Sequence, residues 1–248
     1  MSDRYPMVYG EAAGGDAATA SILAWLARIG AGSAEQLAAG CGLTARVTAA
    51  RLRALEHADA VRSQRLLHTA PALYTLTRRG LRVAGRPELD PVAVSVPGFA
   101  HLLAVGRVAV ALEREGREVG GERELRAFER LEGRPLASAE IGLARDGTVA
   151  LHRPDLVCWE GGRPVAIEVE LTVKAPVRLA TIVRGWARSR LVGGVVYYAT
   201  PSAARALARA IRDENASQRV VVVPLAPAPA PAGEPVEPRS MSSIPSAP

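Results

Sequence analysis

Several kinds of residue are scarce in this chain, and each shortage argues against a particular class of function or site. Lysine occurs once, as Lys174, among 31 basic residues, so arginine carries nearly all of the positive charge. Aromatic residues make up 4% of the chain, which leaves no stacking platform of the kind expected in an RNA-directed enzyme. The two cysteines, Cys41 and Cys158, lack metal-type spacing and give no basis for a disulfide framework.

Signals for export and for membrane insertion are lacking as well. Residues 1–15 contain no apolar stretch behind a charged start, so the sequence predicts no signal peptide. No uninterrupted apolar run approaches the ~18 residues that a membrane span requires. The expected compartment is therefore the cytoplasm, with no membrane partner.

Composition divides the chain into four parts. The 248 residues, 48% of them hydrophobic, are enough for two ordinary domains. We expect an N-terminal domain at 16–86, a linker with three prolines at 87–98, and a second domain at 99–225. The Pro- and Ala-rich tail at 226–248 is predicted to be disordered, because it has too little apolar surface to offset the entropy of ordering.

The first domain has the pattern of a winged helix-turn-helix. Asp16, Ser33 and Thr44 each stand before a stretch with helical signals, as helix-capping residues do. Two β-like runs follow between residues 60 and 76. Helix, short helix, turn, helix and hairpin is the order found in winged helix-turn-helix DNA-binding domains.

Positive charge on this domain supports contact with DNA. Residues 17–86 contain ten arginines and three acidic residues. Arg46 and Arg53 are seven residues apart on the third predicted helix, on the side away from its leucines. We predict that Arg46, Arg51 and Arg53 bind double-stranded DNA, with phosphate contacts giving most of the affinity. The alternative is a small helical domain whose arginines are merely solvated.

The second domain is predicted to alternate helices and strands. Its first helix, three strands, second helix and next strand have the order of the restriction-endonuclease-like fold (αβββαβ). The overall prediction is therefore an α+β / α/β chain with a winged helix-turn-helix at its N-terminus. The elements are expected at 101–115 (helix), 138–144, 154–159 and 164–172 (strands), 176–191 (helix), 195–199 (strand), 202–215 (helix) and 219–224 (strand).

Three acidic residues lie on the two strands of a predicted hairpin. Asp155 opens one strand, while Glu168 and Glu170 are two apart on its partner and therefore share a face. Clustered carboxylates repel one another, and a divalent cation such as Mg²⁺ (or Mn²⁺) relieves that repulsion and can activate a phosphodiester. We expect Asp155 and Glu168 to bind the metal and Glu170 to orient or deprotonate water. The alternative is an acidic strand edge that is simply solvated.

Basic residues follow the acidic strand closely. Lys174, four residues after Glu170, is expected to stabilise the charge that develops on a phosphate; it could instead be a phosphate contact or an ordinary surface residue. Arg178, Arg184 and Arg188 on the next helix are expected to contact DNA, because no acidic residue occurs between positions 171 and 212.

The segments around these acids, Arg153-Pro154-Asp155 and Ile167-Glu168-Val169-Glu170, resemble the PD-(D/E)XK nuclease signature with Glu in place of the final Lys. The resemblance implies a further glutamate from an early helix. We favour Glu122 as this third metal ligand, with Glu124 and Glu113 as alternatives. His101 and His152 are predicted to be structural.

The arrangement as a whole resembles the replication-relaxation family of plasmid and mobile-element proteins. This resemblance implies a role in plasmid replication or DNA mobilisation. The residues that carry it are Leu73–Thr77 with Gly80, Glu122–Arg126, Arg153–Asp155, Ala166–Lys174 and Val196–Tyr198.

Two functions remain open from the sequence. The first is a metal-dependent endodeoxyribonuclease that hydrolyses phosphodiesters and is guided by its winged helix. The second is a catalytically silent, sequence-specific regulator or replication-accessory protein in which the nuclease-like domain binds DNA or forms a homodimer.

Overall fold

The computed structural model describes residues 16–160 and 162–226, and it contains both helices and mixed sheets. The predicted tail at 226–248 lies outside the described residues except for its first residue.

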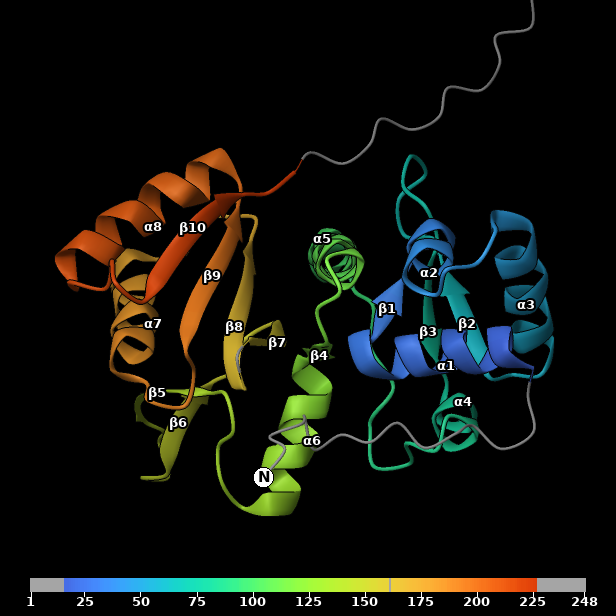
Figure 1. Ribbon diagram of the computed structural model, residues 1–248, viewed down its shortest axis with the longest axis horizontal. Helices are drawn as coiled ribbons and strands as arrows, with labels where there is room; N and C mark the ends of the chain where they lie inside the picture. Colours follow the sequence, from blue (N-terminus) through green and yellow to red (C-terminus); the bar gives the residue numbers. More distant parts are fainter. Residues whose placement is uncertain (1–15, 161, 227–248) are drawn as a thin grey trace, which may run out of the picture.

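The N-terminal unit, residues 17–83, is built on a small antiparallel sheet with strand order β1-β3-β2. Four helices accompany this sheet on the right-hand side of Figure 1. Its elements are α1 (Ala17–Ile29), β1 (Ala31–Gly32), α2 (Ala34–Gly40), α3 (Ala45–His57), β2 (Val61–Gln64), β3 (Leu73–Leu76) and α4 (Arg78–Val83).

Side-chain caps begin the helices of this unit where the sequence predicts them. Asp16 accepts a hydrogen bond from the Thr19 backbone N–H at 2.9 Å, and Thr44 caps α3 in the same way. Ser33 and Gln36 form a complete capping box at α2. The sequence does not predict β1 or α4, because elements of two and six residues are too short to show a hydrophobic period.

The C-terminal unit, residues 96–224, contains a five-stranded sheet with order β10-β9-β8-β7-β4. Strands β8, β9 and β10 run parallel, while β7 is antiparallel to both β8 and β4. Its elements are α5 (Val96–Arg114), β4 (Val119–Gly121), α6 (Glu122–Glu132), β5 (Ala139–Leu143), β6 (Val149–His152), β7 (Leu156–Glu160), β8 (Arg163–Glu170), α7 (Pro176–Arg188), β9 (Gly194–Ala199), α8 (Pro201–Asp213) and β10 (Val220–Pro224).

One predicted strand belongs to a different sheet. The strand expected at 138–144 is β5, which pairs only with β6 in a separate two-stranded ribbon. The strand beside β7 is instead β4, with Val119 opposite Cys158. The three residues of β4 include two glycines, so they show no alternation from which a strand could be predicted.

Helices cover both faces of the five-stranded sheet. On one face Leu156 and Ile167 pack into a core that continues through α5 to α1 and α3. On the other face Ala166 and Tyr197 pack against α7 and α8. Figure 1 shows α7 and α8 outside the sheet and α5 between the sheet and the N-terminal unit. Alternation along β7 and β8 therefore decides which side chains face which helices.

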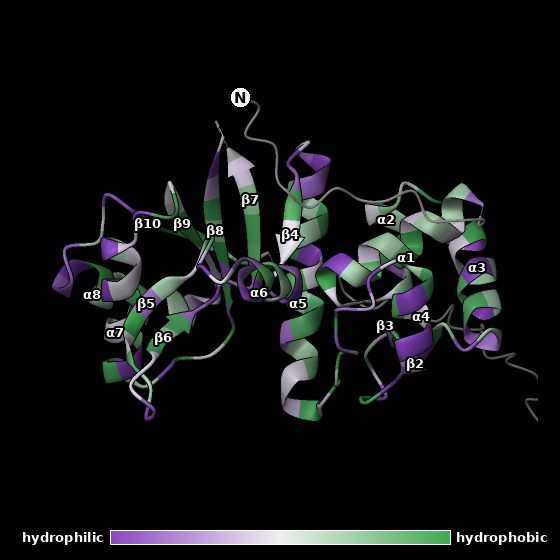
Figure 2. Ribbon diagram, turned by 90° about the horizontal axis from the view of Figure 1, so that it is seen from below, coloured by the Kyte–Doolittle hydropathy of each residue, from purple (hydrophilic) through white to green (hydrophobic). Residues whose placement is uncertain are grey.

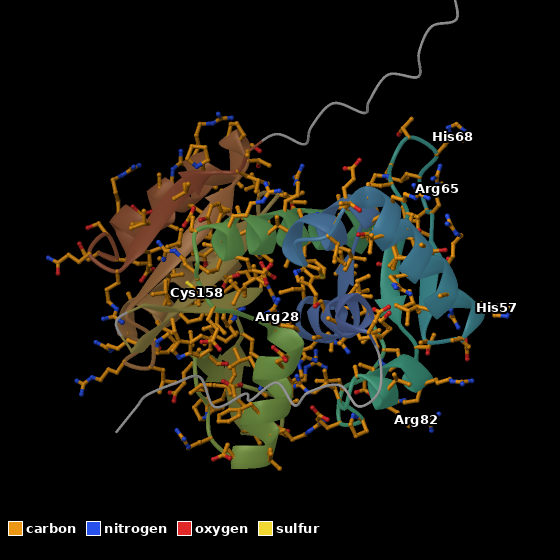
Figure 3. The ribbon with its side chains drawn as sticks, turned by 45° about the vertical axis from the view of Figure 1, so that its right-hand side comes forward. Arg28, His57, Arg65, His68, Arg82 and Cys158 are labelled. Carbon is orange, nitrogen blue, oxygen red and sulfur yellow. The ribbon has the colours of Figure 1, made fainter. Side chains whose placement is uncertain are left out.

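The two units meet across α5 and α6 with buried polar contacts. The Trp25 indole N–H donates to Glu113 Oε2 at 3.0 Å, and Arg28 forms an ion pair with the same carboxylate. Figure 3 shows Arg28 in the interior of the molecule. Gln36 Nε2 donates to the Leu103 carbonyl at 2.7 Å. Since α5 begins at Val96, it starts inside the predicted linker.

α5 has the length and apolar composition that would allow a helix to cross a membrane, but a buried helix at the centre of a protein meets the same criteria. Here Phe99, Ala104, Val108 and Leu112 are all buried. Figure 2 shows hydrophobic residues along much of α5. α5 therefore serves as a packing element between the two units.

Candidate functional site

Three carboxylates approach one another where β7 begins and β8 ends. Glu168 and Glu170 are two residues apart on β8 and share the face that carries Ala166. Asp155 directly precedes β7, and its Oδ2 accepts the Val169 backbone N–H at 2.7 Å. This bond fixes the Asp155 side chain against the strand that carries the two glutamates.

Asp155 also contacts a histidine from α5. His101 Nε2 lies 2.9 Å from Asp155 Oδ1. The hydrogen bond to Asp155 raises the pKa of His101 above its usual value of 6.5, against the opposing effect of burial. Lys174 and Glu170 are also close enough to influence the His101 pKa. Helix α5 therefore supplies a histidine whose protonated form is favoured by Asp155.

Glu168 is the most enclosed member of the site. Its side chain is 6% exposed, and its Oε1 lies 2.7 Å from His152 Nε2 and accepts the Trp186 indole N–H at 3.1 Å. The rings of His152 and Trp186 meet edge to face, with centroids 5.7 Å apart. Burial raises the pKa of Glu168, the His152 bond opposes this, and the nearby charge of Asp155 raises it further.

Glu170 forms an ion pair with Lys174, the single lysine of the chain. The Glu170 side chain is 8% exposed and that of Lys174 is 30% exposed. The lysine charge also lowers the pKa of Glu168. We call the six side chains that share this location the carboxylate cluster: His101, His152, Asp155, Glu168, Glu170 and Lys174.

Tyr197 lies beneath the cluster on β9, opposite Glu168 in the parallel ladder. Its hydroxyl is fully buried near Trp186 and the two glutamates, but it makes no hydrogen bond of good geometry. Burial raises the pKa of Tyr197 well above its usual value of 10. A neutral phenol so placed is a buried hydrogen-bond donor beside the two glutamates.

The early-helix glutamates do not join this cluster. Glu122 donates its backbone N–H to the Asp155 carbonyl at 3.1 Å, but its half-exposed carboxylate pairs with Arg126. Glu124 points into the junction between the units and pairs with Arg86, and Glu113 pairs with Arg28. As the first residue of α6, Glu122 pairs along its own helix with Arg126, and its role as a third metal ligand stays a prediction.

The two histidines that the sequence analysis predicts to be structural complete the cluster. His101 and His152 form hydrogen bonds with Asp155 and Glu168, which are 54 and 16 residues away in sequence. A histidine directly before Arg153-Pro154-Asp155 was the available signal for His152. For His101, no local pattern shows that the start of α5 reaches the end of β7.

The arginines predicted to bind DNA lie on two separate surfaces. Arg46 and Arg53 are exposed on α3, whereas Arg51 forms an ion pair with Asp16. Figure 3 shows His57, Arg65 and Arg82 on the outer side of the N-terminal unit as well. On α7, Arg178 and Arg188 are exposed, and Arg184 is held by both carboxylate oxygens of Glu214.

A divalent cation would have few protein ligands in this cluster. Within residues 16–160 and 162–226, no group of three or more His, Cys, Asp and Glu side chains is arranged to hold a metal ion. Mg²⁺ usually needs only one or two carboxylates, since waters and substrate oxygens complete its shell. The mutual repulsion of Asp155 and Glu168 is what such a cation would relieve. Asp155 and Glu168 are therefore the two carboxylates on which a proposed Mg²⁺ site would rest.

No protein-family model matches this chain, and no curated protein matches it significantly.

Proposed function

We propose that this protein binds double-stranded DNA through its N-terminal unit and hydrolyses phosphodiesters at the carboxylate cluster. One observation carries the proposal: Asp155, Glu168 and Glu170 lie together with Lys174 at the edge of one sheet. We place this activity in plasmid replication or DNA mobilisation in the cytoplasm, through the resemblance to the replication-relaxation family.

The order of the elements supports a nuclease-like second domain. With α6 and the β5–β6 ribbon treated as an insertion, α5, β4, β7, β8, α7 and β9 follow the sequence helix, three strands, helix, strand. Asp155 directly precedes the second strand of that series and the two glutamates lie on the third, an order that resembles the PD-(D/E)XK signature. The N-terminal order of α1, α2, α3 and the β2–β3 hairpin likewise supports a winged helix-turn-helix.

Each residue of the cluster has a distinct task in the proposed reaction. Asp155 and Glu168 would hold Mg²⁺, which supplies positive charge to a phosphodiester oxygen when bound. Glu170 accepts the proton of the attacking water, whose oxygen bonds to phosphorus while one bridging P–O bond breaks. The leaving oxygen takes up a proton from solvent, and Lys174 donates hydrogen bonds to the phosphate. His101 and His152 position the carboxylates of Asp155 and Glu168.

Recognition of DNA is assigned to α3. Arg46 and Arg53 are exposed there, and Leu52 and Leu55 on the other side of the helix are buried. Arginines in that position can enter a major groove and bind phosphates or guanine edges. The affinity for duplex DNA should therefore fall steeply as salt concentration rises.

A cleavage assay tests the proposal. Supercoiled and linear DNA are incubated with the wild-type chain and Mg²⁺ or Mn²⁺, and the same assay is run on Asp155→Asn and Glu168→Gln. We expect both variants to lose at least 100-fold in cleavage rate, because each would lose a charged ligand and transition-state stabilisation (about 10²–10³ for one such group). Glu122→Gln is the matched control and should cut at the wild-type rate.

Cuts that persist in Asp155→Asn and Glu168→Gln would contradict the proposal, as would loss of activity in Glu122→Gln alone. Thermal unfolding of each variant shows whether a loss of activity is merely a loss of fold.

A catalytically silent DNA-binding regulator is the second candidate. A specific observation favours it: each carboxylate of the cluster already has a partner within the protein, namely His101, His152 with Trp186, or Lys174. Tight, salt-sensitive binding of duplex DNA with no cleavage in either cation would establish this candidate in place of the nuclease.

A further inference from the structure

A groove lies between the β5–β6 ribbon and the end of α7, outside the carboxylate cluster. Its volume is about 590 Å³, which falls within the usual range for ligand pockets of about 300–1,000 Å³. A smaller cavity of about 180 Å³ shares Glu140, Gly185 and Arg188 with it and extends it along α7 past Thr181. We call the two together the ribbon groove.

Backbone geometry builds this groove. A Cβ atom at Gly185 would lie 2.7 Å from the Glu140 carbonyl oxygen, so the glycine lets β5 approach α7 closely. The pairing of β5 with β6 shifts between Glu140 and Leu143, and Gly142 in that bulge has a φ of +121°. A bulge of this kind bends its strand locally, and Gly142 and Leu143 beyond the point of contact line the wider part of the groove.

The groove is positively charged. Arg188 and Arg190 both line it and are exposed, and within the part of the chain that the structure describes neither guanidinium has a hydrogen bond or an ion pair. Glu140 is the one acidic residue among the described lining residues. Glu214 faces Arg188 from α8, but it is already bound by Arg184. Arg188 and Arg190 are therefore available to bind an anionic ligand.

Apolar side chains lie beside these arginines. Leu143 is 74% exposed, Val149 50% and Leu191 36%, and all three line the groove. In duplex DNA the base faces are stacked inside and the phosphates lie outside, so an apolar wall gains nothing. An unpaired strand presents phosphates and free base faces together, so arginines can bind the phosphates and aliphatic side chains can bury part of the apolar base faces.

Both walls of the groove reach the carboxylate cluster. The ribbon ends at His152, which contacts Glu168, and α7 carries Trp186, which donates to the same oxygen. We infer that the ribbon groove binds an unpaired DNA strand that leads away from the cluster, with arginines on its phosphates and aliphatic side chains on its bases. The choice of DNA as the polyanion rests on the proposed function.

Binding measured without cleavage tests the inference. A fluorescein-labelled unpaired DNA of about 12 nucleotides, within the usual site size, is titrated with the full chain in EDTA, and the duplex of the same sequence is titrated in parallel. All proteins carry Arg46→Gln and Arg53→Gln, which reduces binding by the N-terminal unit. Adding Arg188→Gln and Arg190→Gln should weaken unpaired-DNA binding about tenfold and lower the salt slope by about 1.4.

The matched control is Arg205→Gln with Arg209→Gln, which removes the same charge from exposed positions on α8. We expect it to change the affinity less than twofold, and we expect Leu143→Ser to weaken unpaired-DNA binding about threefold with no effect on the duplex. Equal losses in the two arginine pairs, or equal losses for unpaired and duplex DNA, would overturn the inference.

The hypothesis of the ribbon groove and the proposed nuclease activity can fail independently of each other. If the protein never cleaves DNA but the loss on Arg188 and Arg190 substitution is specific for the unpaired strand, the groove stands and the nuclease falls. If cleavage is normal and these substitutions leave unpaired-strand affinity unchanged, the groove falls and the nuclease stands.

Discussion

Glu124 at the junction of the two units and Glu168 in the carboxylate cluster are both buried glutamates, yet they have different partners. Burial raises the pKa of each. Glu124 pairs with Arg86, which keeps its proton at any physiological pH. Glu168 instead has His152 and the uncharged Trp186 indole as its hydrogen-bond partners.

The difference indicates which buried acid serves the fold and which serves chemistry. A carboxylate fixed by arginine at a packed junction has a structural role, because removing either charge leaves the other one stranded. A carboxylate held by a histidine and an indole can exchange its partners for a cation or a substrate. Substitutions at the two places should therefore separate stability from activity.

The largest effect on stability is expected at the junction. Arg86→Ala leaves Glu124 buried without its main counter-charge, and we expect a loss of about 3 kcal/mol in the free energy of unfolding. Denaturant titration measures it. Arg82→Ala, which removes an exposed arginine from the same unit, should leave the midpoint unchanged. Equal stability of the two variants would show that the Arg86–Glu124 pair does not stabilise the junction.

A smaller loss is expected where the units touch through their backbones. A Cβ atom at Gly121 would collide with the Arg28 carbonyl oxygen. Gly121→Ala should therefore push α1 away from β4 and cost about 2 kcal/mol in the free energy of unfolding. Gly193→Ala is the control, since its nearest neighbour would lie 3.6 Å away, at ordinary contact distance. Similar unfolding midpoints for both variants would show that α1 and β4 can move apart without a loss of stability.

The cluster should respond in activity more than in stability. In His152→Asn, Glu168 keeps its Trp186 bond and can take up a proton, because burial already raises its pKa. We expect a loss of only about 1 kcal/mol in the free energy of unfolding. DNA cleavage should fall at least tenfold. If the protein does not cleave DNA, its binding to duplex DNA should be unchanged. A stability loss as large as that of Arg86→Ala would make His152 a structural residue.

The smallest effect concerns pH. Because the folded-state pKa of Glu124 lies above its usual 4.5, the stability linked to its proton is fully present below about pH 4.5 and is lost as the pH rises through the folded value. Relative to Glu124→Gln, the wild type should lose stability over that range, by at most about 1.4 kcal/mol per pH unit. The opposite slope in paired unfolding curves would mean that Arg86 dominates over burial.

Sequence periodicity predicts the longer elements, but it misses short strands and a helix whose buried face carries charged residues. The caps of α1, α2 and α3 and the position of β8 are confirmed, because local capping and alternation specify them. α6 is missed because its buried residues include Glu124 and Glu129, so its inward face looks hydrophilic in the sequence. β6 is missed because its four residues are short and only partly buried.

The sequence by itself determines that Glu168 and Glu170 share a face, since strand residues alternate and the two are bonded along one chain. It also determines the excess of arginine on the N-terminal unit. Only the tertiary structure decides that His101 meets Asp155, that His152 meets Glu168 and that Glu124 turns to Arg86 instead. Those contacts depend on how helices pack across a sheet, and no local spacing along the chain specifies that packing.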